Sequence, residues 1–440
     1  MRRLATIVLV LGSITGVIHA ETHAVLPGGS VQEKIDVAVD GDIVAIFGGT
    51  YNQDLTITKR IRLVEINGQD VIITGAVTFT SVADCPPFEG FTVGSNGNKN
   101  IVVNDCTGLV ISGIDHTAGG AIEVNDSEIN ITDSALRNFI HNDGVTALSS
   151  SSLTGKIDQN GGELNVSDVT IATNFDTGND AAKTVAFRTT VTEDCNWRSK
   201  LSWFGYGKAR SFDFYGSDAK VVFVGSEIDA LGEERAGMNL KGSKNNYLIT
   251  NSFLHGTGHS YNDDNDHDNN IEFKEPGSTI VIQNNYFEIG GRTSPRGSYH
   301  IRIEESAGNA TVRNNCFHSN YSAVLAGFGA TIQNNHGNSN FSGGAAPLNT
   351  TTGDPLFVDG DPYQLAEGSP LINAGTEDPR YNDRDGSRNN IGPSGGSWYD
   401  PEGWTTEKPV VISFDLLPDS VLEGVDTEVA IEGVRAVSKP

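Results

Sequence analysis

The chain has 440 residues, of which 30 are basic and 56 are acidic, so its formal net charge is −26 at neutral pH. A charge this acidic disfavours nucleic acid as a partner and excludes a basic membrane-surface protein. Glycine contributes 51 residues, proline only 15, and 37% of the chain is hydrophobic, which excludes both collagen and a disordered polymer. Many glycines without many prolines predict a turn-rich β-structure.

Residues 1–20 have the pattern of a secretory signal. Arg2 and Arg3 precede an apolar run from Ile7 to Ile18, and Ala20 closes the segment. The run is too short to span a bilayer, and no other apolar stretch approaches the ~20 residues that a transmembrane helix needs. We therefore expect a secreted, periplasmic or cell-surface protein with no integral membrane segment after signal removal. An uncleaved N-terminal anchor is the alternative.

Four cysteines, Cys85, Cys106, Cys195 and Cys316, are compatible with an oxidising compartment. Cys85 and Cys106 are separated by about one repeat of the pattern described next, so a disulfide across it is one interpretation. Buried free thiols that act as small hydrophobic side chains are the other. The sequence has no C-x-x-C spacing, which disfavours a zinc or redox motif.

Internal repetition is the strongest signal in the sequence. The segments 248–254, 281–287, 311–317 and 331–335 each place a β-branched run before an asparagine. A unit this short cannot bury its own apolar face, so it must stack on its neighbours. The shared asparagines are expected to form a hydrogen-bonded ladder at one turn of successive coils, which makes them structural rather than catalytic. They are Asn251, Asn284, Asn314 and Asn334.

Two further stretches carry a family resemblance. After a short amphipathic helix expected at residues 30–39, the sequence contains Gly41-Asp42-Ile43, Gly49-Thr50-Tyr51 and Leu55-Thr56-Ile57, and residues 354–396 form a polar closing segment. Together they resemble secreted bacterial proteins of the pectin-lyase-like group. The resemblance implies an all-β, right-handed parallel β-helix of about a dozen coils over residues 21–396, capped by the helix. It leaves activity open, because the group includes lyases, glycoside hydrolases, epimerases and proteins without chemistry.

The register of the repeats predicts a polar grid on the outside of the solenoid. Offsets of 33 and 30 residues align segments 237–242, 270–275 and 300–305, and residues 211–215 fit the preceding coil. Alternate residues of a strand point inward and outward, so the apolar ones are expected to face the core. An extended sugar chain can lie across the outward columns, which are Asp213–Asn239–Glu272–Arg302 and Tyr215–Lys241–Lys274–Glu304, with His300 beside them.

Such a grid contains the side chains that uronate β-elimination needs. The reaction requires a group that neutralises the carboxylate, a base for the C5 proton and a donor for the leaving oxygen. We assign Lys241, Lys274 or His300 as the base and Arg302 as the neutralising group. The other positions are assigned to substrate, with Glu272 and Asp213 binding sugar hydroxyls or a bridging Ca²⁺: Asp213, Tyr215, Asn239, Glu272 and Glu304. The alternative is that opposite charges on neighbouring strands simply pair with one another.

Two long loops interrupt these coils at the same corner. Residues 288–299 are basic, and Arg292 and Arg296 are assigned to substrate binding. Residues 255–270 are acidic and provide oxygen ligands of the kind that Ca²⁺ prefers; a solvated charge run is the alternative. The candidate calcium ligands in this loop are Asp263, Asp264, Asp266 and Asp268.

A second calcium candidate lies at residues 382–390. Asp383, Asp385, Ser387 and Asn389 alternate around Gly386 as in the front half of a calcium loop, but the distal glutamate is missing because Ser394 occupies its position. A cluster of Asx turns without metal is the alternative. Beyond this segment, residues 397–440 change in composition and are expected to form a linker followed by a partial β-sandwich-like or capping segment.

The sequence therefore favours a monomeric, secreted, carbohydrate-active protein. Its expected partner is a polysaccharide, and its expected activity is that of a lyase that cleaves an acidic, uronate-containing polysaccharide. The alternative is a non-catalytic cell-surface or matrix protein that uses the β-helix as a rod or a glycan-binding face.

Overall fold

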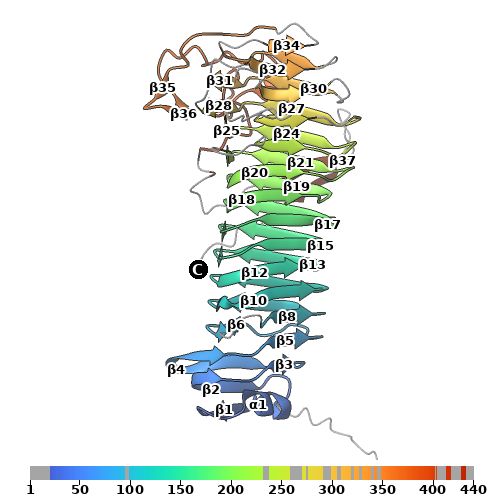
Figure 1. Cartoon of the computed structure of the whole chain (residues 1–440), viewed down its shortest axis with the longest axis vertical. Coiled ribbons are helices and arrows are strands. Elements are labelled where there is room, and N and C mark those ends of the chain that lie inside the picture. The colour runs from blue at the N-terminus through green and yellow to red at the C-terminus, as the bar shows by residue number, and fades with distance from the viewer. Residues whose placement is uncertain are drawn as a thin grey trace, which may run out of the picture.

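The chain is a parallel β-solenoid of about 13 turns, which stands as a long rod in Figure 1. Parallel pairing joins its coils into one 34-stranded sheet, and the predicted fold class is confirmed. The computed structural model describes residues 20–94, 99–230, 237–257, 270–273, 276–290, 299–304, 309–318, 322–326, 330–337, 341–343, 348–401, 403, 413–417 and 428–432.

Helix α1 (Val31–Val37) closes the N-terminal end of the rod, inside the predicted range. Ser30 Oγ accepts a hydrogen bond of 3.1 Å from the Glu33 amide, which satisfies one of the free amides of the first turn. Val31 and Ile35 are buried, so the apolar face of the helix shields the open end of the core. No helix in the described ranges is long and apolar enough to cross a membrane.

Each coil contributes strands to three stacks that run along the rod. The first stack begins at the N-terminal edge, and some of its long strands bend into a second face. Its members in order are β1 (Thr22–Val25), β2 (Ile43–Tyr51), β4 (Arg62–Ile73), β7 (Thr92–Val93), β10 (Asp115–Asn125), β12 (Ala135–His141), β14 (Ser152–Leu153), β16 (Thr170–Ile171), β18 (Thr190–Trp197), β20 (Lys208–Phe214), β22 (Glu227–Asp229), β25 (Phe253–Thr257), β28 (Tyr286–Gly290) and β31 (Cys316–His318).

The second stack carries the predicted grid and shares β10, β12, β18 and β20 with the first. Its own members are β3 (Leu55–Ile57), β5 (Val77–Thr80), β8 (Ile101–Asn104), β15 (Ile157–Ser167), β17 (Phe175–Phe187), β23 (Met238–Leu240), β26 (Ile271–Phe273), β29 (Tyr299–Ile303), β32 (Ser322–Ala326) and β34 (Phe341–Gly343). The third stack shares β15 and β17 with it. The remaining members of the third stack are β6 (Phe88–Glu89), β9 (Thr107–Ser112), β11 (Ser127–Thr132), β13 (Gly144–Ser149), β19 (Leu201–Gly205), β21 (Lys220–Val224), β24 (Asn246–Thr250), β27 (Thr279–Gln283), β30 (Ala310–Arg313) and β33 (Thr331–Gln333).

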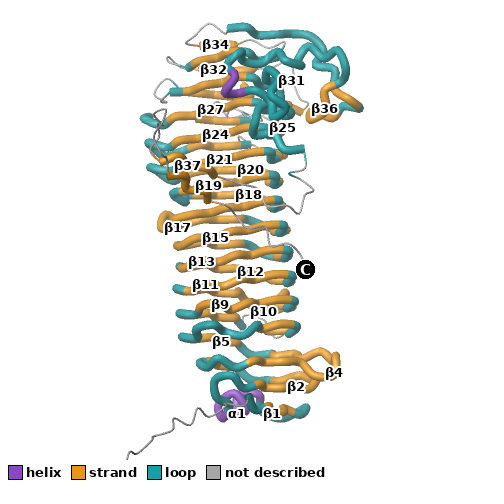
Figure 2. Tube along the Cα trace, turned by 180° about the vertical axis from the view of Figure 1, so that it is seen from behind, coloured by secondary structure: helices purple, strands orange, loops and turns teal. Residues whose placement is uncertain are grey.

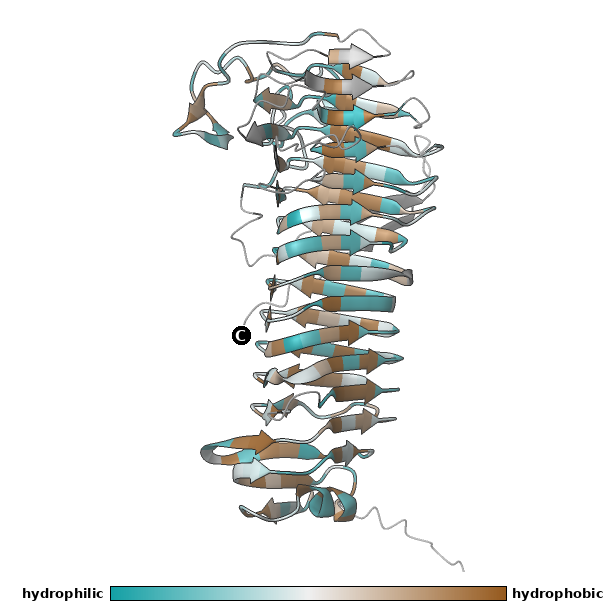
Figure 3. Ribbon diagram, viewed as in Figure 1, coloured by the Kyte–Doolittle hydropathy of each residue, from teal (hydrophilic) through white to brown (hydrophobic). Residues whose placement is uncertain are grey.

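One apolar core runs along the inside of the solenoid. Strands alternate hydrophobic and hydrophilic residues, which gives the brown and teal segments of Figure 3. The inward residues of successive coils stack on one another, as Trp197 does edge-on against Phe212 with ring centroids 5.2 Å apart. Because the coils share this core, none of them can bury its apolar side alone, as the repeat pattern predicted.

A ladder of buried polar side chains ties the upper coils together at the turn between the third and first stacks. Asn315 Oδ1 accepts hydrogen bonds of 3.0 Å from both the amide nitrogen and Nδ2 of Asn285 in the preceding coil. Asn335 accepts the same pair from Asn315, at 3.0 and 3.1 Å. Ser252 donates its amide to Asn285 at 3.0 Å and continues the ladder downward. The ladder therefore satisfies buried backbone amides that the turn leaves without partners.

The predicted ladder was displaced by one residue. Asn251, Asn284, Asn314 and Asn334 do not form it; they take left-handed backbone conformations, with φ from 53° to 56°. Asparagine tolerates this conformation better than most residues, and it produces the sharp bend that ends each strand of the third stack. The residue after the bend points inward and forms the ladder. The shared asparagines are structural, as predicted, but their role is to bend the chain.

The closing segment, 354–396, lies along these bends on the outside of the upper coils, beside β25 and β31 (Figures 1 and 2). It contains the antiparallel pair β35 (Phe357–Val358) and β36 (Asp361–Leu365) and the short helix η1 (Pro379–Tyr381). Asn251 Nδ2 donates to Gly395 O at 2.6 Å, and Asn284 Nδ2 donates to Asn390 O at 2.8 Å. The bend asparagines therefore also bind this segment. A separate antiparallel hairpin follows, formed by β37 (Ser413–Leu417) and β38 (Glu428–Glu432).

All four cysteines are buried free thiols. The structure therefore supports the interpretation that the cysteines act as small hydrophobic side chains. Cys85 and Cys106 do not form a disulfide. Burial raises the pKa of the Cys85 thiol to about 12, which keeps it protonated and unreactive at neutral pH.

The ladder predicts that two asparagines of the same rod differ sharply in how much their replacement lowers the stability of the protein. Replacing Asn315 with alanine removes buried hydrogen bonds and leaves polar groups unpaired, which should cost about 1–3 kcal/mol of stability. Asn130→Ala on the exposed side of β11 should change stability by less than ~0.5 kcal/mol. Unfolding followed by circular dichroism checks both variants. Equal midpoints for the two would contradict the proposed role of the ladder.

Candidate functional site

The predicted register of the grid is confirmed. Backbone pairing aligns Asp213 with Asn239, Asn239 with Glu272, and Glu272 with Arg302. The flanking inward residues are buried, as expected: Phe212, Phe214, Met238, Leu240, Ile271, Phe273, Ile301 and Ile303. One polar residue between two buried apolar ones is thus presented outward by each coil of the second stack. We name this line of residues the polar column.

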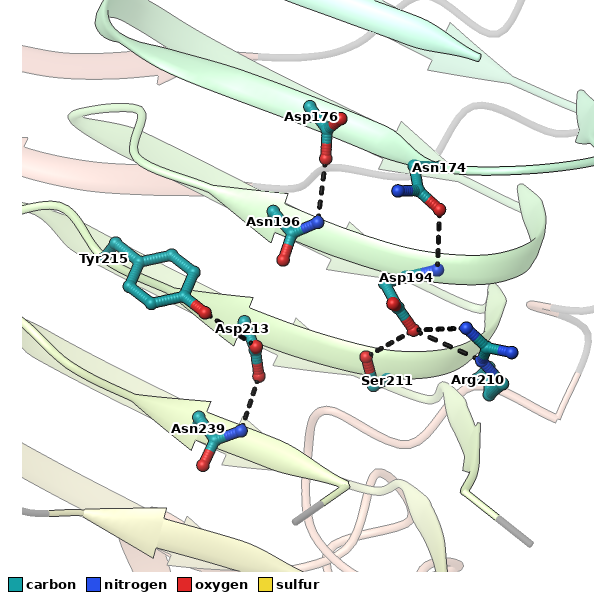
Figure 4. Close-up of polar contacts among 9 residues, drawn as sticks. All are labelled: Asn174, Asp176, Asp194, Asn196, Arg210, Ser211, Asp213, Tyr215 and Asn239. Atoms are coloured by element: carbon teal, nitrogen blue, oxygen red, sulfur yellow. Dashed lines mark hydrogen bonds and ion pairs between the residues drawn. The ribbon is translucent and has the colours of Figure 1, made fainter. Parts of the chain in front are cut away.

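The polar column extends two coils further than the sequence indicated. Asp176 pairs with Asn196 and Asn196 with Asp213 in the same register, and the three lie on successive strands from the top of Figure 4 downward. Asn196 Nδ2 donates to Asp176 Oδ1, and Asn239 Nδ2 donates to Asp213 Oδ1, both at 2.8 Å. Amides alternate with carboxylates, so each carboxylate meets a donor rather than another negative charge.

Beside the column, two cations flank one aromatic ring. Tyr215 donates its hydroxyl to Asp213 Oδ2 at 2.8 Å, which fixes the ring against the column (Figure 4). The Arg198 guanidinium lies 5.1 Å from the ring centroid and Lys241 Nζ lies 5.2 Å from it, both within range of a cation–π interaction. Within the described residues, neither Arg198 nor Lys241 forms an ion pair with a carboxylate. Two half-buried positive charges are thus held near each other without an ion-pair partner among the described residues.

The upper end of the column is a charge-paired cluster. Arg302 lies between two glutamates, 3.5 Å from Glu272 Oε1 and 3.6 Å from Glu304 Oε1. The alternative anticipated from the sequence, pairing of opposite charges on neighbouring strands, holds here. The arginine positive charge is already compensated, so a substrate carboxylate would have to compete for it.

A second acidic group lies at the edge of the same face. Asp194 Oδ1 accepts hydrogen bonds from Arg210 Nη2 at 3.1 Å and from Ser211 Oγ at 2.9 Å (Figure 4). The carboxylate is therefore held by its own neighbours.

The prediction that His300 points outward is wrong. Its side chain is fully buried and packs against Phe287 and Phe317, with ring centroids 6.0 and 5.4 Å away. Burial lowers its pKa to about 3, and Nδ1 lies 3.3 Å from Asn270 Oδ1. Asn270 is buried as well; His300 and Ile301 are consecutive buried residues of β29, as Asn270 and Ile271 are in the coil below, so the alternation is broken at this point. A histidine enclosed in this way cannot remove a proton from a polysaccharide.

Several predicted residues lie outside the described residues, and their roles stay predictions. They are Lys274 of the grid, Arg292 and Arg296 of the basic loop, and Asp263, Asp264, Asp266 and Asp268 of the acidic loop. Within the described part of the chain, no group of three or more His, Cys, Asp or Glu side chains is placed to hold a metal ion.

The calcium candidate at Asp383 and Asp385 is a pair of hydrogen-bonded turns. Asp383 Oδ1 accepts from the Gly396 amide at 2.6 Å and from the Asn390 amide at 3.2 Å. Asp385 Oδ1 accepts from the Ser387 amide at 2.9 Å. Partial burial raises the pKa of Asp383, whereas hydrogen bonds from Ser387 lower that of Asp385. These carboxylates already stabilise the closing segment, and their calcium role stays a prediction.

The sequence contained a signal for Asp176 and Asn196, the two residues of the polar column that were not predicted. Phe175-Asp176-Thr177 and Cys195-Asn196-Trp197 place one polar residue between two buried ones, as Phe212-Asp213-Phe214 does. Their coils lack the asparagine that marks the bend in the later repeats; Arg188 and Tyr206 take the left-handed conformation there. The asparagine repeat therefore does not mark these two coils.

Comparison with known proteins does not define an activity. No protein-family model and no curated protein matches the sequence. Among solved structures, the chain is similar to pectate lyase Pel9A, with 15% identity and a TM-score of 0.34 over 86% of this chain and 97% of that one. The parallel solenoid itself rests on the strand pairing described above.

The buried histidine predicts acid sensitivity. The imidazole takes up a proton near pH 6.5 when the chain is unfolded but only near pH 3 when it is folded. The unfolded state therefore binds more protons between these values, so stability is highest above pH 6.5 and decreases as the pH falls. His300→Gln keeps a polar side chain without the titration and should weaken this decrease.

Chemical unfolding of the wild type and of His300→Gln between pH 7 and pH 4 tests whether the variant loses less stability as the pH falls. Parallel curves for the wild type and His300→Gln would show that His300 is already charged in the fold. Such a result would contradict its burial.

Proposed function

We propose that the protein binds an acidic, uronate-containing polysaccharide along the polar column and cleaves it by β-elimination. One observation carries the proposal: Arg198 and Lys241 flank Tyr215 on the outer face and form no ion pair with a described carboxylate. Half-buried cations that lack a partner are stabilised by an anionic ligand, and a uronate carboxylate is an anion of suitable size.

The overall charge makes this local arrangement necessary. A net charge of −26 repels a polyanion, so a polyuronate can approach only where positive charge is concentrated. The Arg198–Tyr215–Lys241 stack provides such a place next to carboxylates and amides that hydrogen-bond sugar hydroxyls. Neighbouring coils are about 4.8 Å apart, so an extended chain can contact several of them.

The reaction assigns a separate task to each side chain. Arg198 would bind the uronate carboxylate and stabilise the negative charge that develops when the C5 proton leaves. The Lys241 ammonium must first release a proton to solvent; the neutral amine would then take the C5 proton, and the electron pair of the C–H bond would form the 4,5 double bond as the glycosidic oxygen departs with a proton from solvent. Arg302 is less suited to the neutralising role than the sequence suggested, because two glutamates already surround it.

Calcium is not required in this scheme. The carboxylates of the column are separated by amides, and Asp213 already accepts hydrogen bonds from Tyr215 and Asn239. The donor set therefore does not form a preassembled cation site, and we derive no step through a metal. We place the activity outside the cytoplasm because of the predicted signal, of which residues 1–19 lie outside the described residues.

A non-catalytic glycan-binding rod is the second candidate. The observation that favours it is that the carboxylates of the column are occupied by internal hydrogen bonds and that His300 is buried. A face made of satisfied polar groups can hold a sugar chain without reacting with it.

Activity measurements distinguish the two candidates. The wild type should convert at least one of alginate, pectate and glycosaminoglycans into an unsaturated product that absorbs in the ultraviolet. Lys241→Ala should lower kcat by about 10²–10⁴-fold, the usual contribution of a general base. Arg198→Ala should lower kcat/KM, and Lys99→Ala, an exposed lysine far along the rod, should change neither.

Retained binding without any unsaturated product would support the glycan-binding rod and refute the lyase. Full activity in Lys241→Ala would remove Lys241 from the mechanism. Melting temperatures of the variants must stay near that of the wild type, because both replaced side chains lie on the outer face.

A further inference from the structure

The third stack carries an apolar patch on its outer side, away from the polar column. Pairing aligns five outward residues on successive strands: Val185, Trp203, Val222, Leu248 and Val281. The same line continues as Asn165 below the patch and as Thr311 above it. The apolar character is therefore confined to five coils.

Other residues of the chain cover this apolar patch. Val185 and Val222 are only 1% and 5% exposed, although they lie on the opposite side of the strands from the core and form a separate hydrophobic cluster. Among described residues, Trp398 lies over the patch, and together they line a cavity of 290 Å³. Gly403 packs against the ring of Tyr206, which belongs to the same cluster. The chain that leaves the closing segment thus begins to cross the patch.

The β37–β38 hairpin that follows has one apolar face, which matches the apolar patch in character. Residues 414 and 431 pair, as do 416 and 429, so these four positions lie on one face of the hairpin; they are Phe, Leu, Val and Ile in the sequence. A two-stranded hairpin is marginal in water unless its apolar face is covered. By the same register, positions 415, 428 and 432, which are acidic in the sequence, lie on the opposite face of the hairpin.

We infer that the apolar patch is the docking site of the β37–β38 hairpin, which forms a strap across the back of the solenoid. Both views draw β37 next to β19 and β21, in front of them in Figure 2. The strap lies on a different stack from the polar column. The C-terminal part of the chain is thereby held on one face while the sugar-binding face stays open.

Hydrogen exchange on the full chain tests the strap. Amides of residues 413–417 and 428–432 should be protected in the wild type, and Val222→Asp and Leu248→Asp should each reduce that protection at least about tenfold. Thr311→Asp, in the same line but beyond the patch, should leave it unchanged. Protection of β20 and β23 in the same experiment shows that the solenoid stays folded.

The alternatives give different results. Rapid exchange of the hairpin in the wild type, or protection that Val222→Asp does not alter, would overturn the proposal. So would a wild-type dimer in sedimentation that Val222→Asp converts to monomer, because a second copy would then cover the patch.

Discussion

The whole architecture depends on the hydrogen-bonded ladder at the bend between the third and first stacks. Each bend residue takes a left-handed conformation, and the next residue turns inward and binds the backbone of the adjacent coil. A shift of register by one residue would leave these buried amides without partners and would turn apolar side chains outward. The ladder therefore fixes the stacking of all outward residues, including those of the functional face.

Because the register is fixed, the outward residues of the three faces can differ in their chemistry. The second stack presents carboxylates, amides and cations, the third presents an apolar patch over five coils, and the bends present asparagines that bind the closing segment. One repeated unit thus supplies a polar face for a ligand and an apolar face for its own chain. These roles do not interfere, because they lie on different strands of each coil.

The sequence predicted the fold and the centre of the functional face because the repeat offsets carry the register directly. The alignment of Asp213, Asn239, Glu272 and Arg302 follows from those offsets alone. Alternation failed at His300, where two consecutive residues of β29, His300 and Ile301, are buried, and no local pattern indicates this. The stack of Arg198 and Lys241 on Tyr215 was not predicted, because Arg198 belongs to a coil without the asparagine motif. The predicted ladder position was off by one residue because the bend asparagine and the residue after it, such as Asn284 and Asn285, are both polar. Only the backbone geometry distinguishes them.

The central claim is that a uronate binds beside the Arg198–Tyr215–Lys241 stack with its carboxylate at Arg198. A crystal structure of the Lys241→Ala variant soaked with a trimer of the preferred uronate tests it directly, because the intact substrate should persist. The account predicts a sugar chain along the polar column with one carboxylate beside the Arg198 guanidinium and a sugar ring close to Tyr215. An oligosaccharide bound on another stack, or with its carboxylates turned away from Arg198, would contradict it.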